Sequence, residues 1–235
     1  MSSDAITLGT AATLGFLHAL EVDHMVAVTT FVSRRPSLAS AGGFGLRWGL
    51  GHSVAVLLAG GVVLATGVRW PERYDALGEG LVGLMLVGLG LWALAAARKL
   101  HLHSVEEHGG HAHLHVHAAG LPHAHPHHGA RSAGHPHEHG GITLVGLLHG
   151  FAGTTGVVAL LPVTLTDRVG LGLGYLAAFG IGVTLAMTLF ALAAAAVMRR
   201  ATAGSLAWGR RVVVVVGMSG IAVGLWWIAA AAGLL

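Results

Sequence analysis

Hydrophobic residues in this chain gather into long continuous runs, which short polar stretches separate. Apolar runs of about 20 residues can cross the hydrocarbon core of a bilayer as helices. The runs do not alternate between apolar and polar positions, so membrane-spanning strands are not expected. The pattern predicts an all-α integral membrane protein with six transmembrane helices, over roughly residues 6–32, 44–66, 77–97, 142–164, 170–197 and 212–235.

The composition supports this fold class. Hydrophobic residues make up 54% of the 235 residues and charged residues 10%, whereas soluble domains carry about 25% charged residues. The mean hydropathy is +0.72. The chain contains no cysteine, which excludes disulfides and thiolate metal ligands. No basic segment precedes the first apolar run, so we expect that run to be retained rather than cleaved as a signal peptide.

The positions of Lys and Arg predict the orientation in the membrane, because these residues are enriched in cytoplasmic loops. Three of the 13 basic residues, Arg69, Arg73 and Arg168, share their side of the membrane with four acids. The other ten are assigned to the opposite side, after the first, third and fifth runs: Arg34, Arg35, Arg47, Arg98, Lys99, Arg131, Arg199, Arg200, Arg210 and Arg211. We therefore expect a multi-pass protein of the cytoplasmic membrane with both termini extracytoplasmic and residues 98–141 cytoplasmic. Basic residues so placed indicate topology, and we expect no nucleic-acid partner.

The two halves of the chain resemble each other. Three blocks keep their order: residues 15–20 align with 146–151, 48–56 with 179–187, both at an offset of 131 positions, and 90–92 with 224–226 at an offset of 134. Coincidence among 37 glycines is the alternative explanation. With three spans each, the halves must insert in opposite orientations. We expect a 3+3 inverted repeat, an arrangement that places the substrate site between the repeats near mid-membrane. The first repeat would be residues 1–97 and the second residues 142–235, with the 98–141 loop between them.

Four ionisable residues stand close together inside the first apolar run: His18, Glu21, Asp23 and His24. Ionisable groups at membrane depth are costly and usually functional. Imidazoles and carboxylates together are ligands of divalent transition metals. A proton relay through the same residues is the main alternative, and helix packing alone would be an expensive use for them.

A regular helix cannot aim all four of these side chains at one ion. His18, Glu21 and His24 fall within an arc of about 120°, whereas Asp23 points about 100° beyond His24. Either the helix is locally unwound, which is tolerated where backbone lines a polar cavity, or one acid orients a ligating imidazole instead of binding the metal.

Two further histidines, His52 and His149, stand at similar expected depths on the second and fourth runs. A metal site on three helices is therefore plausible, although each of the two histidines alone could serve as a hydrogen bonder between helices. His149 is the repeat counterpart of His18, but the counterparts of the other first-half ligands do not ionise. We expect an asymmetric site, to which Ser53, Thr154 and Thr155 are candidate polar contributors.

Three motifs on different predicted helices resemble those of the nickel/cobalt transporter superfamily. The pattern His18-x4-Asp23-His24 resembles the first-helix motif of nickel/cobalt permeases, with Glu21 where Asp is usual. Residues 50–54, Leu-Gly-His-Ser-Val, are similar to their second-helix motif, and residues 148–154 resemble an element of the shorter, urease-accessory type permeases. The resemblance implies His18, Asp23 and His24 as the core of a metal site.

Residues 98–141 contain 14 of the 18 histidines, separated mainly by Gly, Pro and Ala. Such a segment cannot build a core, so we expect it to be disordered when no metal is bound. Closely spaced imidazoles raise the effective concentration of metal ligands. The candidate ligands for metal capture are His111, His113, His115, His117, His123, His125, His127, His128, His135, His137 and His139. A solvated linker between the repeats is the alternative.

These observations predict a divalent-metal transporter and not an enzyme. Imidazole and carboxylate ligands suit Ni, Co, Zn, Cu(II) and Fe(II), so the choice of Ni²⁺, with Co²⁺ second, comes from the resemblance. The ion is cargo, and no prosthetic group is expected. Expected partners are the metal ion, the lipid bilayer and cytoplasmic nickel chaperones.

The direction of transport stays open at this point. We favour uptake, and the alternatives are proton-coupled efflux of the same metals, a membrane metal sensor or storage protein, and a membrane metallo-enzyme. The chain has no G-x-x-x-x-G-K-[ST] loop, so coupling to ATP would need another protein.

Overall fold

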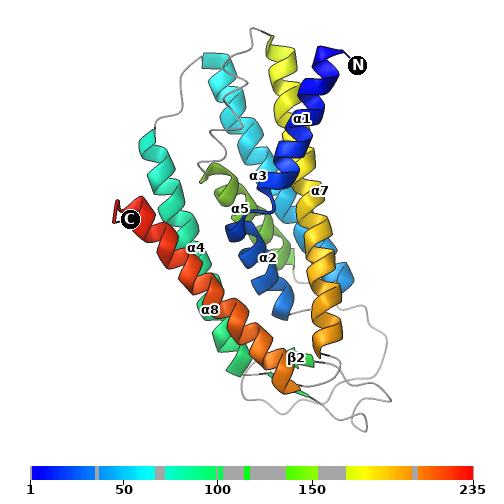
Figure 1. Ribbon diagram of the computed structural model, residues 1–235, viewed down its shortest axis with the longest axis vertical. Helices are drawn as coiled ribbons and strands as arrows, with labels where there is room; N and C mark the ends of the chain where they lie inside the picture. The colour runs from blue at the N-terminus through cyan, green and yellow to red at the C-terminus, as the bar shows by residue number, and fades with distance from the viewer. Residues whose placement is uncertain are drawn as a thin grey trace.

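The computed structural model describes residues 2–34, 37–66, 72–98, 100–102, 114–116, 136–152, 168–202 and 206–234. These residues are helical apart from one pair of short strands (Figure 1). The elements in chain order are α1 (Ser3–His18), α2 (Val22–Arg34), α3 (Leu38–Thr66), α4 (Glu72–Arg98), β1 (Leu100–Leu102), β2 (Leu114–Val116), α5 (Pro136–Phe151), α7 (Val169–Thr202) and α8 (Leu206–Ala231).

Four of these helices are long and apolar enough to cross a membrane: α3, α4 over Ala76–Ala95, α7 and α8. Helices α1 and α2 together form a fifth candidate span, bent by 58° at a short break. Helix α5 contributes a shorter apolar segment, Ile142–Phe151. The protein is therefore a multi-pass membrane protein. The predicted span over residues 142–164 stays a prediction, because residues 153–167 lie outside the described part of the chain.

The break between α1 and α2 resolves the geometric problem posed by the first apolar run. The last turn of α1 tightens, with Leu20 N–H donating to Leu17 O and Glu21 N–H donating to His18 O, each at 3.0 Å. Helix α2 then starts with Asp23 in its first turn. A carboxylate is favourable there, because the first amides of a helix have no intrahelical partner and the dipole attracts negative charge. The local unwinding considered from the sequence is confirmed.

Two differences from the predicted pattern concern residues 98–141. Strands β1 and β2 pair antiparallel, with Leu100 opposite Val116 and Leu102 opposite Leu114; their alternation of apolar residues with histidine suits a strand. Helix α5 begins at Pro136, a residue favoured in the first turn of helices because it lacks the N–H that would find no partner. Regular structure is thus described at β1, β2 and residues 136–141, and the expected disorder of the remaining loop stays a prediction, because that part lies outside the described residues.

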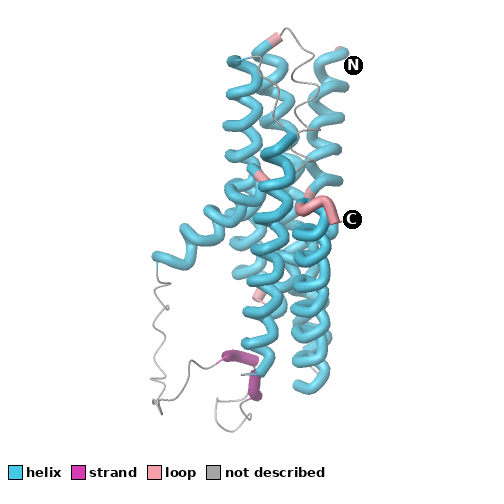
Figure 2. Tube along the Cα trace, turned by 90° about the vertical axis from the view of Figure 1, so that its left-hand side faces the viewer, coloured by secondary structure: helices cyan, strands magenta, loops and turns pink. Residues whose placement is uncertain are grey.

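The long helices pack in crossed pairs. Helix α3 packs on α7 and α5, α1 packs on α7, and α4 packs on α8. The α4–α8 pair lies along one side of the molecule, while α2 and α5 lie between it and the α1–α7 pair (Figure 1). The N-terminus lies at the end of the molecule opposite the strands, whereas the C-terminus lies near mid-height (Figures 1 and 2). The sidedness of the termini and of the 98–141 segment stays a prediction.

The closest helix contacts recur in pairs. A Cβ added at Gly15 would collide with the backbone of Phe179, and a Cβ added at Gly146 would collide with the backbone of Trp48. Gly146 follows Gly15 by 131 positions, and Phe179 follows Trp48 by the same number. The recurrence supports the internal repeat read from the sequence, with glycines allowing α1 to approach α7 as α5 approaches α3. The full 3+3 arrangement remains a proposal.

Candidate metal site

Four buried histidines meet where α1 ends and α2 begins. His18 closes α1, His24 stands in the first turn of α2, and His52 and His149 come from α3 and α5. His18 is 7% exposed and the other three are exposed by 2% or less. The ring centroids lie 4.7 Å apart for His18 and His24, 5.2 Å for His18 and His52, 5.3 Å for His24 and His52, and 4.2 Å for His24 and His149. The structure thus brings together the three-helix cluster that the sequence predicts.

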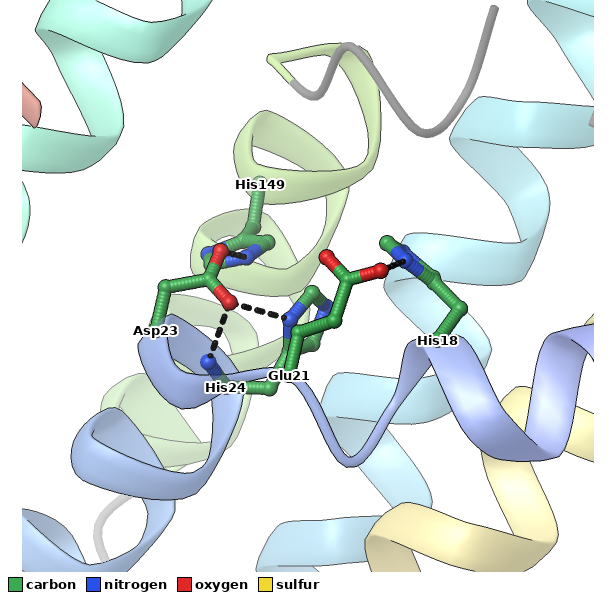
Figure 3. A network of polar contacts seen from close by, with 5 residues as sticks. All are labelled: His18, Glu21, Asp23, His24 and His149. Atoms are coloured by element: carbon green, nitrogen blue, oxygen red, sulfur yellow. Dashed lines mark hydrogen bonds and ion pairs between the residues drawn. The ribbon is translucent and has the colours of Figure 1, made fainter. Parts of the chain in front are cut away.

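The carboxylate of Asp23 joins two of these histidines across the site (Figure 3). Its Oδ1 lies 3.0 Å from Nδ1 of His24, and its Oδ2 lies 3.1 Å from Nε2 of His149. A carboxylate bonded to an imidazole fixes the ring orientation and makes the remaining nitrogen a better metal ligand. Nε2 of His24 and Nδ1 of His149 are those remaining atoms, and neither has a hydrogen-bond partner among the described residues.

Glu21 lies in the break itself, on the other side of the cluster (Figure 3). Its Oε1 is 3.1 Å from Nδ1 of His18, and its side chain is 39% exposed, against 10% for that of Asp23. The two acids therefore have different surroundings: Asp23 is buried among imidazoles, whereas Glu21 lies at the more open edge of the cluster.

His52 gives the most direct argument for a bound ligand. Both of its ring nitrogens are buried and have no hydrogen-bond partner within the described part of the chain. Burying polar atoms without a partner costs free energy, so a protein rarely retains such a histidine without use. A divalent cation held by imidazole nitrogens and a carboxylate would satisfy these atoms, and the donor set suits first-row transition metals.

The spacing of the candidate ligands fits a metal ion after small side-chain movements. Two triads, His18–His24–His52 and Asp23–His24–His149, each offer three ligand atoms within 4.8 Å of one another. Two ligands of one ion can lie at most about 4.2 Å apart when each bond is about 2.1 Å. Rotations that move ligand atoms by less than an ångström would close the triads.

A cavity adjoins the cluster and adds residues that sequence reasoning did not assign to the site. Glu79 and Val82 of α4 and Trp227 of α8 line it together with the candidate ligands. Glu79 is the informative addition, because a third carboxylate then borders the cavity. Its signal in the sequence is an acidic residue inside the apolar run 77–97.

Aromatic side chains flank the cluster at both ends. The ring of Phe179 stacks on His18 with centroids 5.6 Å apart, and the ring of Trp48 lies 5.7 Å from that of His149. These two contacts are also related by the offset of 131 positions. The aromatic rings restrict the orientation of the two outer histidines and keep water away from those faces.

The remaining predicted site residues divide into two groups. The Ser53 hydroxyl lies in the α3–α7 contact, 2.7 Å from Gly49 O, 2.9 Å from Gly180 O and 3.1 Å from Thr184 Oγ1; it serves helix packing rather than the cavity. Thr154 and Thr155 lie outside the described residues. So do the loop residues His111, His113, His117, His123, His125, His127, His128 and His135, and for His115, His137 and His139 only the backbone is described.

Comparison with known proteins identifies relatives of this chain, although no family model and no solved structure match it. The chain is 31% identical over 198 residues to the urease accessory protein UreH of Bacillus sp. strain TB-90, covering 80% of this chain and 77% of that protein. It is 34% identical over 110 residues to the high-affinity nickel transport protein of Cupriavidus necator, covering 42% of this chain and 30% of that protein. The extent of the first match, together with the three motifs, shows that the chain belongs to the nickel/cobalt transporter family.

Proposed function

We propose that this protein transports a divalent transition-metal ion across the cytoplasmic membrane, with Ni²⁺ as the first substrate and Co²⁺ as the second. The observation that carries the proposal is the buried cluster of four histidines and Asp23 at a break in a membrane helix. The names of its relatives, one of them a nickel transport protein, support nickel as the cargo. The cluster binds the ion after its water shell is removed.

We favour uptake over efflux on energetic grounds. Moving one elementary charge across the membrane potential is worth about 2.3 kcal/mol per 100 mV, so a divalent ion entering the cell gains about 4.6 kcal/mol. A uniporter needs no further energy source for this direction. The acidic groups at the cavity, Glu21 and Glu79, favour the arrival of a cation by raising its local concentration.

Proton-coupled efflux is the second candidate function. The hydrogen bonds between Asp23 and two histidines favour it, because a metal ion and a proton would compete for the same atoms. In that case the protein would lower cellular nickel, and flux would depend on the proton gradient.

Accumulation of ⁶³Ni²⁺ in cells with and without the protein tests this proposal. Uptake predicts higher cellular ⁶³Ni²⁺ with the wild-type protein and background accumulation with His24→Ala. Thr30→Val provides a matched control, because it changes another buried polar residue of α2 without touching the cluster. Lower accumulation than in cells without the protein would identify an exporter, and equal accumulation in all strains would refute transport.

A further inference from the structure

The candidate ligands divide into two triads that share one residue. His18 and His52 form one triad with His24, and Asp23 and His149 form the other with the same His24. His24 contacts the rings of all three other histidines, and no other member of the cluster belongs to both triads. Among the described residues, His24 alone belongs to both triads and is therefore placed to hold an ion in either one.

Among the described residues, the candidate ligand atoms gather into two groups of three, and not into one group of all five residues. The ring of His149 lies 4.2 Å from that of His24 and 5.9 Å from that of His52, measured between ring centroids. His149 is also held by Asp23, on the side of the cluster away from Glu21 (Figure 3). An ion held by one triad therefore reaches the remaining ligands of the other triad only after side chains move.

Each triad has its own carboxylate. Asp23 belongs to one triad directly, and Glu21 lies beside His18 in the other. The chemistry of the two positions is therefore similar, with imidazoles and one acid each, so the same ion can occupy either. Their surroundings differ: the His18 position adjoins the 39% exposed Glu21 side chain, and the Asp23 position adjoins α5 in the buried part of the site.

We propose that the cluster holds one divalent ion at two alternative positions, and that the ion passes between them while His24 remains bound. This inference rests on the proposed transport function for its role but is a statement about binding. At one position the ion is held by His18, His24 and His52, and at the other by Asp23, His24 and His149. Exchanging ligands around one constant imidazole avoids releasing a bare divalent ion into the membrane interior. Two ions do not bind together, because they would repel each other and compete for His24.

Binding of Co²⁺ to the purified full-length protein tests the proposal, since the visible spectrum of Co²⁺ reports its ligands. Replacing the 14 histidines between residues 101 and 139 with Asn removes metal binding by that segment while keeping the chain length. In this background, His52→Asn removes a ligand of one position and His149→Asn removes a ligand of the other. His24→Asn removes a ligand of both, and Thr30→Val is the matched control.

The expected result is one bound Co²⁺ per chain in the parent protein. His52→Asn and His149→Asn should each still bind one ion, about tenfold more weakly, with spectra that differ from each other. His24→Asn should weaken binding at least 100-fold. Gel filtration and circular dichroism establish folding, and His52→Gln and His149→Gln replace any variant that does not fold.

Three results would overturn the inference: two ions bound at once, identical spectra for His52→Asn and His149→Asn, or loss of binding in either as complete as in His24→Asn. A protein that binds as expected but moves no ⁶³Ni²⁺ would refute the proposed function while leaving the two positions intact.

Discussion

Oδ2 of Asp23 lies 3.1 Å from Nε2 of His149, although 126 positions separate the two residues in the chain. The contact joins the first turn of α2 to the last turn of α5, so the two halves of the chain meet at a charged group. The same carboxylate also contacts His24. Asp23 thus contacts two candidate metal ligands from different halves at once.

Asp23→Asn should therefore weaken metal binding, because it removes the negative charge of the side chain while keeping nearly the same side-chain size. Loss of a carboxylate that supports metal-binding histidines commonly costs about 10- to 100-fold in affinity. We expect a reduction in this range for Co²⁺ or Ni²⁺, measured by equilibrium dialysis with purified protein. Asp4→Asn is the control, because Asp4 pairs with Arg168 at the surface, away from the site. Equal effects of the two substitutions would contradict the role given to Asp23.

Glu79→Gln should affect the arrival of the ion more than its binding. Glu79 borders the cavity but belongs to neither triad. We expect the Ni²⁺ concentration for half-maximal flux to rise several-fold, with the maximal flux within about twofold of wild type, in a concentration series of initial rates. Unchanged rates at all concentrations would show that the ion does not pass this carboxylate.

The packing of α1 on α7 gives a stability prediction. A methyl group at Gly15 would overlap the carbonyl of Phe179, so Gly15→Ala should destabilise the protein by about 1–3 kcal/mol, the usual cost of overpacking. Gly9→Ala, in the same helix, is the control, since nothing lies within 4 Å of its added Cβ; it should be neutral or stabilising by up to about 1 kcal/mol. Thermal unfolding in detergent measures both, and equal unfolding temperatures would argue against this contact.

The absence of native cysteine makes the topology directly testable. A single cysteine at position 133 should resist an impermeant thiol reagent in intact cells, whereas one at position 3 should react. The reason is the concentration of basic residues on the side of the 98–141 segment. Labelling of position 133 in intact cells would reverse the predicted orientation.

Helical periodicity in the first apolar run was informative, because a regular helix cannot direct all four of its ionisable side chains toward one ion. It showed that Asp23 could not share a face with His18 and His24 on a straight helix. The chain breaks at residues 19–21, which is one of the two solutions that the sequence allowed. Asp23 also lies within hydrogen-bond distance of His24 and His149. Similar calculated depths for His18, His52 and His149 also predicted that these residues meet, as the ring contacts confirm.

Other features depend on packing between distant segments and leave no periodic signal. Glu79 joins the cavity because α4 packs on α8 and brings both beside the cluster. The division of the ligands into two triads likewise follows from the positions of α3 and α5 around His24. Ser53 was a candidate site residue because it directly follows His52 in the sequence. Its side chain leaves α3 in a different direction, however, and its hydroxyl donates to Gly180 O of α7.

The central claim is that the His24 cluster conducts the metal ion, and Ni²⁺ flux into proteoliposomes tests it most directly. Purified wild-type protein, His24→Ala and Thr30→Val would be reconstituted with a metal-sensitive dye inside the vesicles and an inside-negative potential applied. The account predicts Ni²⁺ entry with wild type and Thr30→Val and only the leak rate of empty vesicles with His24→Ala. Entry through His24→Ala at the wild-type rate, with equal amounts of folded protein, would contradict it.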